Sequence, residues 1–384
     1  MKIRLTGAVQ LEILERYFRE AGYTIATPEE IPEVTYDVTS HEAVLAKEVD
    51  GFYDERLKAL AGCPYSVAGI QAIVEEFKWS LMSSAKKVLA VDADNTLWEG
   101  ILSEDGRDAL KPYSEFQAFL KALSEEGVVL VLLSKNDPGS IEGMDFFTLK
   151  AVNWEPKAGN LIEACRELNL GVDSVVFVDD NPHERAQMKA HLPEVTVVDF
   201  VPPPTAQFMR RLKEYFFSAS APTREDRLRV ADYRNRLRSK SEYLGDLDLR
   251  VEARPAEARD LERLAQMASK TNQFNATTLR RSVSNLSSLL SSLFIFSTSD
   301  KYGEQGIVGY VIVEEGRITD FVMSCRAMGR TLEHFMYNWI AARWGRRLPI
   351  DFVATPKNAP FAAFLKEVEV GGELKTYYKE KNHG

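Results

Sequence analysis

The stretch KVLAVDADNTLWEG, residues 87–100, places two carboxylates at the end of an apolar strand. Lys87–Val91 has the continuous apolar pattern of a strand that is buried on both faces of a sheet. Asp92 and Asp94 follow it, one residue apart. Because an unpaired charge is costly to bury, either the two side chains are solvated in a turn or the fold holds them there for a cation and a chemical step.

Apolar strands and helices alternate from residue 85 to residue 204. One helix is expected to run from a capping box of Ser114 and Gln117 to a stop at Gly127. Buried strands that are separated by helices indicate an α/β fold with a parallel sheet covered on both faces. The further strands predicted for this sheet are Val128–Leu133, Ser174–Val178 and Val195–Phe200.

Polar residues gather where these strands end. In a parallel sheet, ligands bind in the crevice at the carboxyl ends of the strands. Asp92 and Asp94 lie at one such end, and Asp179 with Asp180, in VFVDDNP, at another. Lys157, in NWEPKAGN, precedes a helix that leads into the strand before Asp179. The residues at a third strand end are Ser134, Lys135 and Asn136.

These residue types suit phosphoryl transfer. Asp92 can attack phosphorus and form an aspartyl phosphate, and Asp94 can protonate the leaving oxygen and then activate water. Carboxylates can hold Mg²⁺, which takes oxygen ligands, and Lys157 can bind a phosphoryl oxygen and offset negative charge. The alternative is that each carboxylate only caps the turn that follows it. The predicted metal ligands are Asp92, Asp94, Asp179 and Asp180, and the predicted substrate-binding residues beside them are Thr96, Ser134, Lys135 and Asn136.

Length and composition limit the classes of function. A chain of 384 residues is too long for one ordinary core and indicates two or three domains. A net charge of −9 argues against binding to nucleic acid. No apolar run approaches the roughly 20 residues of a membrane span, and no secretion signal is visible. Three scattered cysteines fit a reducing compartment, so we expect a cytoplasmic protein that binds neither nucleic acid nor membrane.

The pattern changes after the triple proline at 202–204. The charged, arginine-rich residues that follow are interpreted as a solvated helical connector, with a basic docking face for an acidic partner as the alternative. Beyond it, strands flanked by helices predict an α+β domain. The C-terminal strands are expected in LRVEARP, LFIFSTSD, GIVGYVIVEEG and RITDFVMSC and near DFVAT and LKTYY, and the helices at Ala256–Lys270 and Thr331–Arg343. The predicted division is a short α/β or helical segment over 1–84, a catalytic domain over 85–204, the connector over 205–248 and the α+β domain over 249–384.

DADNT, LLSKN, Lys157 and VFVDDNP together resemble the motifs of the haloacid dehalogenase (HAD) superfamily. DNTLWEG and the stretch from NWEPKAGN to VDDNPHER are similar to its FkbH-like branch. Two positions depart from that branch, since its WGG is Trp98-Glu99-Gly100 here and its cysteine before the SKN triplet is Leu133. The resemblance implies a HAD-type Rossmann-like sheet with a minimal cap, a Mg²⁺ cofactor, Asp92 as nucleophile, Asp94 as acid and base, Ser134 and Lys157 as phosphate ligands and Asp179 as metal ligand.

A second motif, R-x-x-G-x-T, lies in MSCRAMGRTLEHF, residues 323–335. Arg326 and Gly329 are predicted to bind substrate, because backbone N–H groups at a helix start can bind pyrophosphate. An ordinary turn is the alternative. Cys325 is a predicted catalytic thiol, because a neighbouring cation and a helix N-terminus lower the pKa of a thiol. The alternative is a small apolar residue of the strand, as free cysteines usually are.

This motif, with KTNQFNATT and TPKNAP, again resembles the FkbH-like family, and its setting resembles the GNAT acyltransferase fold. The resemblance implies an enzyme that dephosphorylates 1,3-bisphosphoglycerate and loads the glyceryl unit onto the phosphopantetheine thiol of an acyl carrier protein in polyketide biosynthesis. Two alternatives stay open. One is a HAD phosphatase of a small phosphorylated metabolite with a GNAT-like scaffold, and the other is an interaction protein that has kept the fold without the chemistry.

Overall fold

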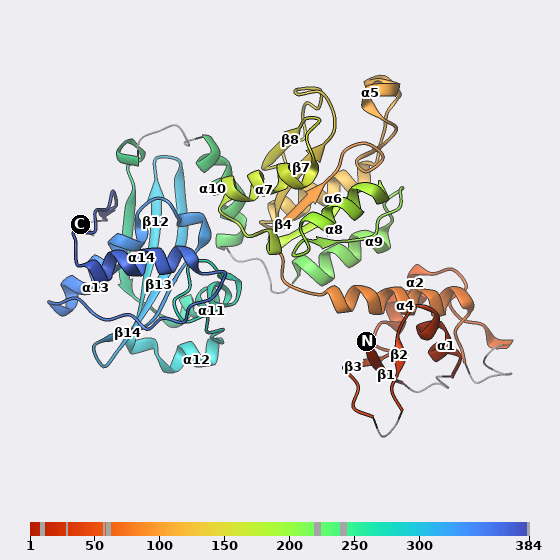
Figure 1. Ribbon diagram of the computed structural model, residues 1–384, viewed down its shortest axis with the longest axis horizontal. Helices are drawn as coiled ribbons and strands as arrows, with labels where there is room; N and C mark the ends of the chain where they lie inside the picture. The colour runs from red at the N-terminus through yellow and green to blue at the C-terminus, as the bar shows by residue number, and fades with distance from the viewer. Residues whose placement is uncertain are drawn as a thin grey trace. The chain divides into compact units, whose positions relative to one another are not determined.

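The computed structural model describes residues 1–7, 12–27, 30–56, 58, 63–218, 224–238 and 244–381 (Figure 1). The chain divides into two compact units. One consists of Met1–Ser84 and Thr205–Ala219, and the other of Ala85–Pro204 and Ser220–Gly384. The four-segment division predicted from the sequence stays a prediction. Among the described residues, no helix combines the length and apolar character that crossing a membrane requires.

The first unit is built on a three-stranded parallel sheet with the order β2-β1-β3. Residues after the triple proline pack here, because Arg211 donates from Nε to the fully buried Glu76 at 2.7 Å. The strands are β1 (Lys2–Thr6), β2 (Thr24–Ile25) and β3 (Val34–Asp37), and the helices are α1 (Glu12–Glu20), α2 (Glu42–Glu48), α4 (Val67–Met82), α9 (Ala206–Leu212) and a π-helical turn at Lys213–Phe217.

The second unit begins with a five-stranded sheet in the order β10-β9-β4-β7-β8. Every neighbouring pair in it is parallel, which confirms the α/β fold class predicted from the buried apolar strands. β8 was not predicted, and β10 is shorter than expected. The strands are β4 (Val88–Val91), β7 (Val129–Ser134), β8 (Leu149–Val152), β9 (Val175–Val178) and β10 (Thr196–Val197).

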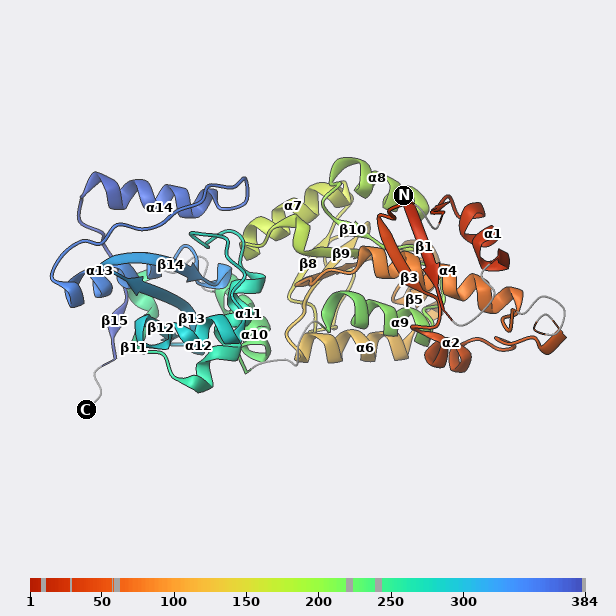
Figure 2. The same ribbon diagram turned by 90° about the horizontal axis from the view of Figure 1, so that it is seen from below.

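Helices cover both faces of this sheet. α7 and α8 lie on one side and α6 on the other (Figure 2). Leu161 and Cys165 of α7 and Met188 of α8 pack with Val88 and Val131 in one core. The helices are α6 (Ser114–Glu125), α7 (Lys157–Leu168), α8 (Pro182–His191) and α10 (Arg224–Arg238).

The capping box predicted for α6 is wrong. Ser114 is already the first helical residue, and Tyr113 at the N-cap makes no side-chain capping bond. Gln117 donates instead to the carbonyl oxygen of Leu97 at 2.9 Å. The segment before α6 is a small antiparallel hairpin of β5 (Trp98–Glu99) and β6 (Lys111–Pro112), with α5 (Leu102–Asp105) between them. The minimal cap is therefore confirmed.

A second five-stranded sheet, in the order β14-β13-β12-β11-β15, forms the C-terminal part of this unit. It is antiparallel except for the pair β11 and β15, so the predicted α+β class is confirmed. The strand near DFVAT is absent from those residues, and that near LKTYY lies just beyond them. The strands are β11 (Arg250–Pro255), β12 (Leu293–Asp300), β13 (Gly303–Glu314), β14 (Arg317–Met323) and β15 (Lys379–Glu380).

This sheet is also covered on both faces. Met336 and Phe361, from α13 and α14, share a core with Phe321. Leu264 and Leu286, from α11 and α12, share another core with the opposite face. The helices are α11 (Leu261–Lys270), α12 (Val283–Ser288), α13 (Leu332–Trp344) and α14 (Ala359–Val370).

Candidate active site

The centre of the parallel sheet brings three strand ends together. β4 lies between β7 and β9, with Val91 opposite both Leu132 and Val178. The backbone N–H of Asp92 donates to the carbonyl oxygen of Val178 at 3.0 Å. The loops that follow β4, β7 and β9 therefore start side by side at one edge of the sheet.

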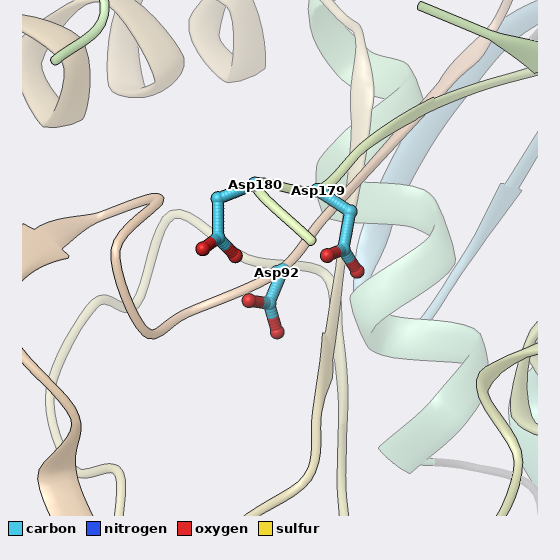
Figure 3. Close-up of side chains that lie close together, drawn as sticks. All are labelled: Asp92, Asp179 and Asp180. Carbon is cyan, nitrogen blue, oxygen red and sulfur yellow. The ribbon is translucent and has the colours of Figure 1, made fainter. Parts of the chain in front are cut away.

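Asp92, Asp179 and Asp180 form a carboxylate cluster at this edge (Figure 3). One carboxylate oxygen of each lies within 4.8 Å of the others. Burial raises the pKa of all three carboxyl groups, because the charged form loses its water. A divalent cation would offset that cost, and Mg²⁺ takes oxygen ligands of this type. The donor set therefore fits the predicted Mg²⁺ cofactor.

Lys157 links two of these carboxylates. Its Nζ atom donates to Oδ1 of Asp92 at 2.7 Å and to Oδ2 of Asp179 at 2.6 Å. Burial disfavours the ammonium, but the carboxylates of Asp92 and Asp179 outweigh burial and raise the pKa of Lys157. The lysine stays charged, and its single positive charge leaves the group of three carboxylates net negative.

Asp94 lies outside the carboxylate cluster formed by the described residues, although it was predicted as a metal ligand. Its Oδ1 atom accepts from the indole Nε1 of Trp98 at 3.0 Å and from the backbone N–H of Leu102 at 2.9 Å. Its Oδ2 atom accepts from Nδ2 of Asn136 at 2.7 Å. Because both oxygens are engaged, the carboxylate is held by the cap and by the loop after β7. This fixed position suits an acid and base better than a metal ligand.

The loop after β7 places its three predicted residues differently. Ser134 and Asn136 are buried, and Nδ2 of Asn136 also donates to Oγ of Ser134 at 3.0 Å. Lys135 turns toward α8, where its Nζ atom lies 2.6 Å from Oε1 of Glu184. Thr96 is fully buried, and its Oγ1 atom has no hydrogen-bond partner within the described part of the chain. Ser134 and Asn136 are thus joined to Asp94, whereas Lys135 pairs with a residue that was not predicted.

Arg185 is a further residue that was not predicted. Its Nη1 atom donates to the carbonyl oxygens of Asp179 at 2.8 Å and Asp180 at 2.7 Å. The same atom reaches the carbonyl oxygen of Phe200 at 3.2 Å. The guanidinium therefore fixes the backbone that carries two of the clustered carboxylates. The signal in the sequence was an arginine in the first turn of the helix that follows VFVDDNP.

Trp154 was also not predicted. Its side chain is 58% exposed, and its Nε1 atom donates to Oδ1 of Asp137 at 2.9 Å. Asp137 follows Asn136, and Trp154 precedes Lys157 by three residues. The indole is therefore a fixed aromatic surface close to the polar cluster. The signal in the sequence was a tryptophan three residues before Lys157.

Cys325 is not brought to the carboxylate cluster. It lines a cavity together with Lys87, the residue before β4. Asp92 follows the same strand at its other end. Four strand residues span about 13 Å, so the thiol and the carboxylates lie toward opposite ends of β4. The thiol is therefore not placed to act at Asp92, and the catalytic role predicted for Cys325 stays a prediction.

Arg326 and Gly329 lie with Cys325, away from the carboxylates. Arg326 is 3% exposed, its guanidinium donates to the carbonyl oxygen of Gln305, and it lies 3.8 Å from Oδ2 of Asp232. Gly329 has a φ of +78°, the left-handed conformation that a turn before α13 requires. These contacts hold the C-terminal part of the unit together, and the role of both residues in binding substrate stays a prediction.

No protein-family model and no curated protein matches the chain. Among solved structures, the N-terminal part of protein BF1531 from Bacteroides fragilis, described as containing a phosphatase domain complexed with Mg, is 26% identical with a TM-score of 0.38. The match covers 54% of this chain and 59% of that one, so the chain spans less than two thirds of that structure.

Two more solved structures match the chain and are described as phosphatases. The 3-deoxy-D-manno-octulosonate 8-phosphate phosphatase of Moraxella catarrhalis, complexed with magnesium, phosphate and the sugar acid, is 14% identical with a TM-score of 0.26. That match covers 44% of this chain and 98% of that one. A probable YrbI-family phosphatase of Pseudomonas syringae is 16% identical with a TM-score of 0.26, over 43% of this chain and 96% of that one.

Proposed function

We propose that the chain is a Mg²⁺-dependent phosphatase of the HAD type that works through an aspartyl phosphate. The observation that carries the proposal is the buried group in which Lys157 contacts both Asp92 and Asp179 while Asp180 lies within reach of the same point. Structural carboxylates are rarely buried in such numbers around one lysine, since each loses its hydration. The binding of a phosphoryl group and its cation would account for such a cluster.

Asp92, Asp179 and Asp180 would hold the metal ion. When bound, Mg²⁺ supplies positive charge that neutralises the phosphoryl oxygens and orients them. Lys157 adds a fixed ammonium to the same end of the site, and Ser134 offers a hydroxyl to a phosphoryl oxygen. Lys157 and Ser134 do not need to move, because each is buried and hydrogen-bonded before substrate arrives.

Asp92 supplies the nucleophile. Its carboxylate oxygen forms a bond to phosphorus while the bond from phosphorus to the leaving oxygen breaks, and Asp94 donates its proton to that oxygen. Water then attacks the aspartyl phosphate, Asp94 takes the proton of the water, and inorganic phosphate leaves with Asp92 restored. The contacts of Asp94 with Trp98, Leu102 and Asn136 keep its carboxyl group in one place through both steps.

We propose the finer function on the resemblance of both halves to the FkbH-like family. In this proposal, the thiol of a phosphopantetheinylated acyl carrier protein displaces phosphate from the acyl phosphate of 1,3-bisphosphoglycerate. The Asp92 site hydrolyses the remaining phosphate ester and leaves a glyceryl thioester for polyketide biosynthesis. Because Cys325 and Asp92 lie toward opposite ends of β4, we place the transfer directly on the carrier thiol, without an enzyme thioester.

Two measurements test the phosphatase activity and the glyceryl transfer separately. Phosphate release from a small phosphomonoester should require Mg²⁺ and be lost in Asp92→Asn, because an amide is a poor nucleophile and a poor metal ligand. Full activity of that variant would refute the phosphatase. Intact-mass analysis of a holo carrier protein, incubated with enzyme, Mg²⁺ and 1,3-bisphosphoglycerate, should show the mass gain of a glyceryl group. Phosphate release with no mass gain would leave the phosphatase and refute the transfer.

A further inference from the structure

A cavity of about 220 Å³ lies at the amino end of the parallel sheet, away from the carboxylate cluster. The parallel-sheet part of the unit contributes Lys87, which precedes β4, and the loop Leu170–Ser174. The C-terminal part contributes residues of three separate segments. This volume is many times the roughly 10–15 Å³ that one water requires, which is enough for a small organic or inorganic ion.

The three C-terminal segments are the motifs that the phosphatase chemistry leaves unused. KTNQFNATT supplies Asn272 and Gln273, MSCRAMGR supplies Cys325, and TPKNAP supplies Pro356 and Lys357. These stretches are far apart in the sequence, and each contributes at least one polar or reactive side chain to the same small space. Three segments that the phosphatase chemistry does not use therefore meet at one pocket.

Several contacts define the walls of the cavity. Lys87 donates from Nζ to the carbonyl oxygen of Lys270, and Lys357 forms an ion pair with Asp173. Lys86 also donates to the carbonyl oxygen of Asp173, at 2.7 Å. A Cβ atom at Gly171 would lie 2.4 Å from Oδ1 of Asp173, so only glycine leaves this wall as it is. The ammonium of Lys87 therefore has a fixed place beside the thiol-bearing segment.

Several positively charged side chains lie near Lys87. Burial lowers the pKa of Lys87; among its neighbours, Cys325 and Asp173 favour the ammonium, whereas Arg229 and Arg280 oppose it. Burial, with the charges of Arg229, Arg263 and Lys87, lowers the pKa of Lys270 to about 7. An anion beside Lys87 would relieve this repulsion.

The carboxylates of the cavity offset only part of that charge. Asp173 favours the ammonium of Lys87, but it is also paired with Lys357. Glu194 is solvent-exposed, so water screens its charge. Besides these carboxylates, the lining includes an ammonium, a thiol and the amides of Asn272 and Gln273, which can donate hydrogen bonds to oxygen acceptors.

We propose that this cavity is a binding site for a small oxyanion, a carboxylate or phosphate group, held by the ammonium of Lys87 beside the thiol of Cys325. The site is separate from the carboxylate cluster, because β4 lies between them. It does not depend on the proposed function. The alkylation rate of Cys325 reports whether the site is occupied, since the thiol lines the cavity and a ligand bound to Lys87 would shield the thiol.

Alkylation of Cys325 in the full chain tests the proposal. The rate with iodoacetate, an anion, and with iodoacetamide, its neutral counterpart, is followed by intact mass and peptide mapping. Compared with a free small thiol, Cys325 should favour the anionic reagent by about tenfold, since a field of fixed positive charge raises the local concentration of anions. Lys87→Met should abolish that preference. Lys366→Met is the control, because Lys366 is exposed on α14 and does not line the cavity, and Cys325→Ala corrects for the buried Cys63 and Cys165.

Protection by ligands tests the same site without a change at Lys87. Inorganic phosphate or malonate should slow the alkylation of Cys325 by iodoacetamide in a saturable way. The protection should persist in Asp92→Asn, whose phosphatase site is disabled, and the more effective of the two ions identifies the class of ligand. The proposal would be overturned if Cys325, compared with a free small thiol, showed no preference for iodoacetate over iodoacetamide. It would also be overturned if neither ion protected Cys325, or if the protection were lost in Asp92→Asn.

Discussion

The Nζ atom of Lys157 lies 2.7 Å from Oδ1 of Asp92, across 65 residues of sequence. The contact is buried on both sides, with 6% of the lysine side chain and 7% of the aspartate side chain exposed. Breaking a buried pair by removing one partner leaves an uncompensated charge, which costs about 3–5 kcal/mol. Without Lys157, the uncompensated charges would be those of the carboxylates. Loss of the lysine should therefore destabilise the fold and strengthen the binding of a cation at the same place.

We therefore predict opposite effects of Lys157→Met on stability and on metal affinity. Without metal, the variant should unfold at a lower temperature than the wild type, because two of the three clustered carboxylates lose the ammonium that they contact. With Mg²⁺, its unfolding temperature should rise more than that of the wild type, since the lysine no longer repels the cation. Phosphate release should stay low even with Mg²⁺, because the phosphoryl oxygens lose a ligand.

Thermal unfolding with and without Mg²⁺ measures both effects. Lys135→Met is the matched control, because Lys135 pairs with Glu184 and does not contact Asp92. It should respond to Mg²⁺ as the wild type does. An equal Mg²⁺-dependent shift in Lys157→Met and the wild type would show that no cation binds next to this lysine.

A second prediction concerns Asp94, whose carboxyl group we propose as acid and base. With an alkyl phosphate, Asp94→Asn should lose about 10²–10⁴-fold in rate, the usual contribution of a positioned acid or base. With p-nitrophenyl phosphate the first step should be affected much less, because this leaving group needs no proton. The second step still lacks its base, so p-nitrophenol should appear in a burst of one equivalent, with the phosphoryl group left on the enzyme.

Rapid-quench kinetics and intact mass of the quenched protein check this prediction. The burst should vanish when Asp92→Asn is added to Asp94→Asn, because the phosphoryl acceptor is then gone. Equal losses with both substrates and no phosphorylated protein would mean that Asp94 only supports the fold of the cap.

The parallel sheet could be predicted because its strands are buried on both faces. Val88–Val91 and Val175–Val178 are entirely buried, and such strands read as continuous apolar runs. β8 escaped prediction for the converse reason, since Leu149–Val152 lies at the edge and has no fully buried residue. The polar residues of the site could be predicted because they come directly after strands whose carboxyl ends share one edge.

The partners of these residues could not be predicted, because they come from distant segments. Nothing in the sequence indicates that Trp98 donates to Asp94, or that Arg185 reaches back to the carbonyl oxygens of Asp179 and Asp180. The position of Cys325 beside Lys87 depends on how the C-terminal sheet packs against the loop after α7, which local patterns do not determine. The capping box at Ser114 failed because the helix begins one residue earlier than the pattern requires.

Arg185 gives a third prediction, about metal affinity. Its Nη1 atom donates to the carbonyl oxygens of Asp179 and Asp180, so it positions the backbone that carries two of the proposed metal ligands. Residues that orient metal ligands typically contribute about 10–100-fold to metal affinity or activity. In Arg185→Met, the Mg²⁺ concentration for half-maximal phosphate release should rise by about that factor, and much of the rate should return at saturating Mg²⁺.

Titration of activity with Mg²⁺ measures this shift. Lys189→Met is the matched control, because Lys189 also lies near Asp199 but donates to neither carbonyl oxygen. Arg185→Met with an unchanged Mg²⁺ requirement and a lower rate at all concentrations would assign the residue to stability alone.

Lys270 gives a fourth prediction, about the pH dependence of stability. Burial is the main cause that lowers the pKa of this lysine to about 7, from 10.5 in the unfolded chain. Between these values the unfolded chain binds a proton that the folded chain does not, so the free energy of unfolding rises with pH, by up to about 1.4 kcal/mol per pH unit. Below pH 7 both states are protonated, and the folded state carries the full cost of the buried ammonium.

Lys270→Met should therefore be more stable than the wild type near pH 7, and the difference should shrink as the pH rises to about 9. Hydrogen exchange of α11 and β13, followed by mass spectrometry in increasing denaturant, reports the stability of this unit without a contribution from the other. Lys366→Met, at an exposed position on α14, should show a difference from the wild type that does not change with pH. A constant difference for Lys270→Met as well would mean that the ammonium keeps its proton in the folded chain, since a group protonated in both states contributes no slope.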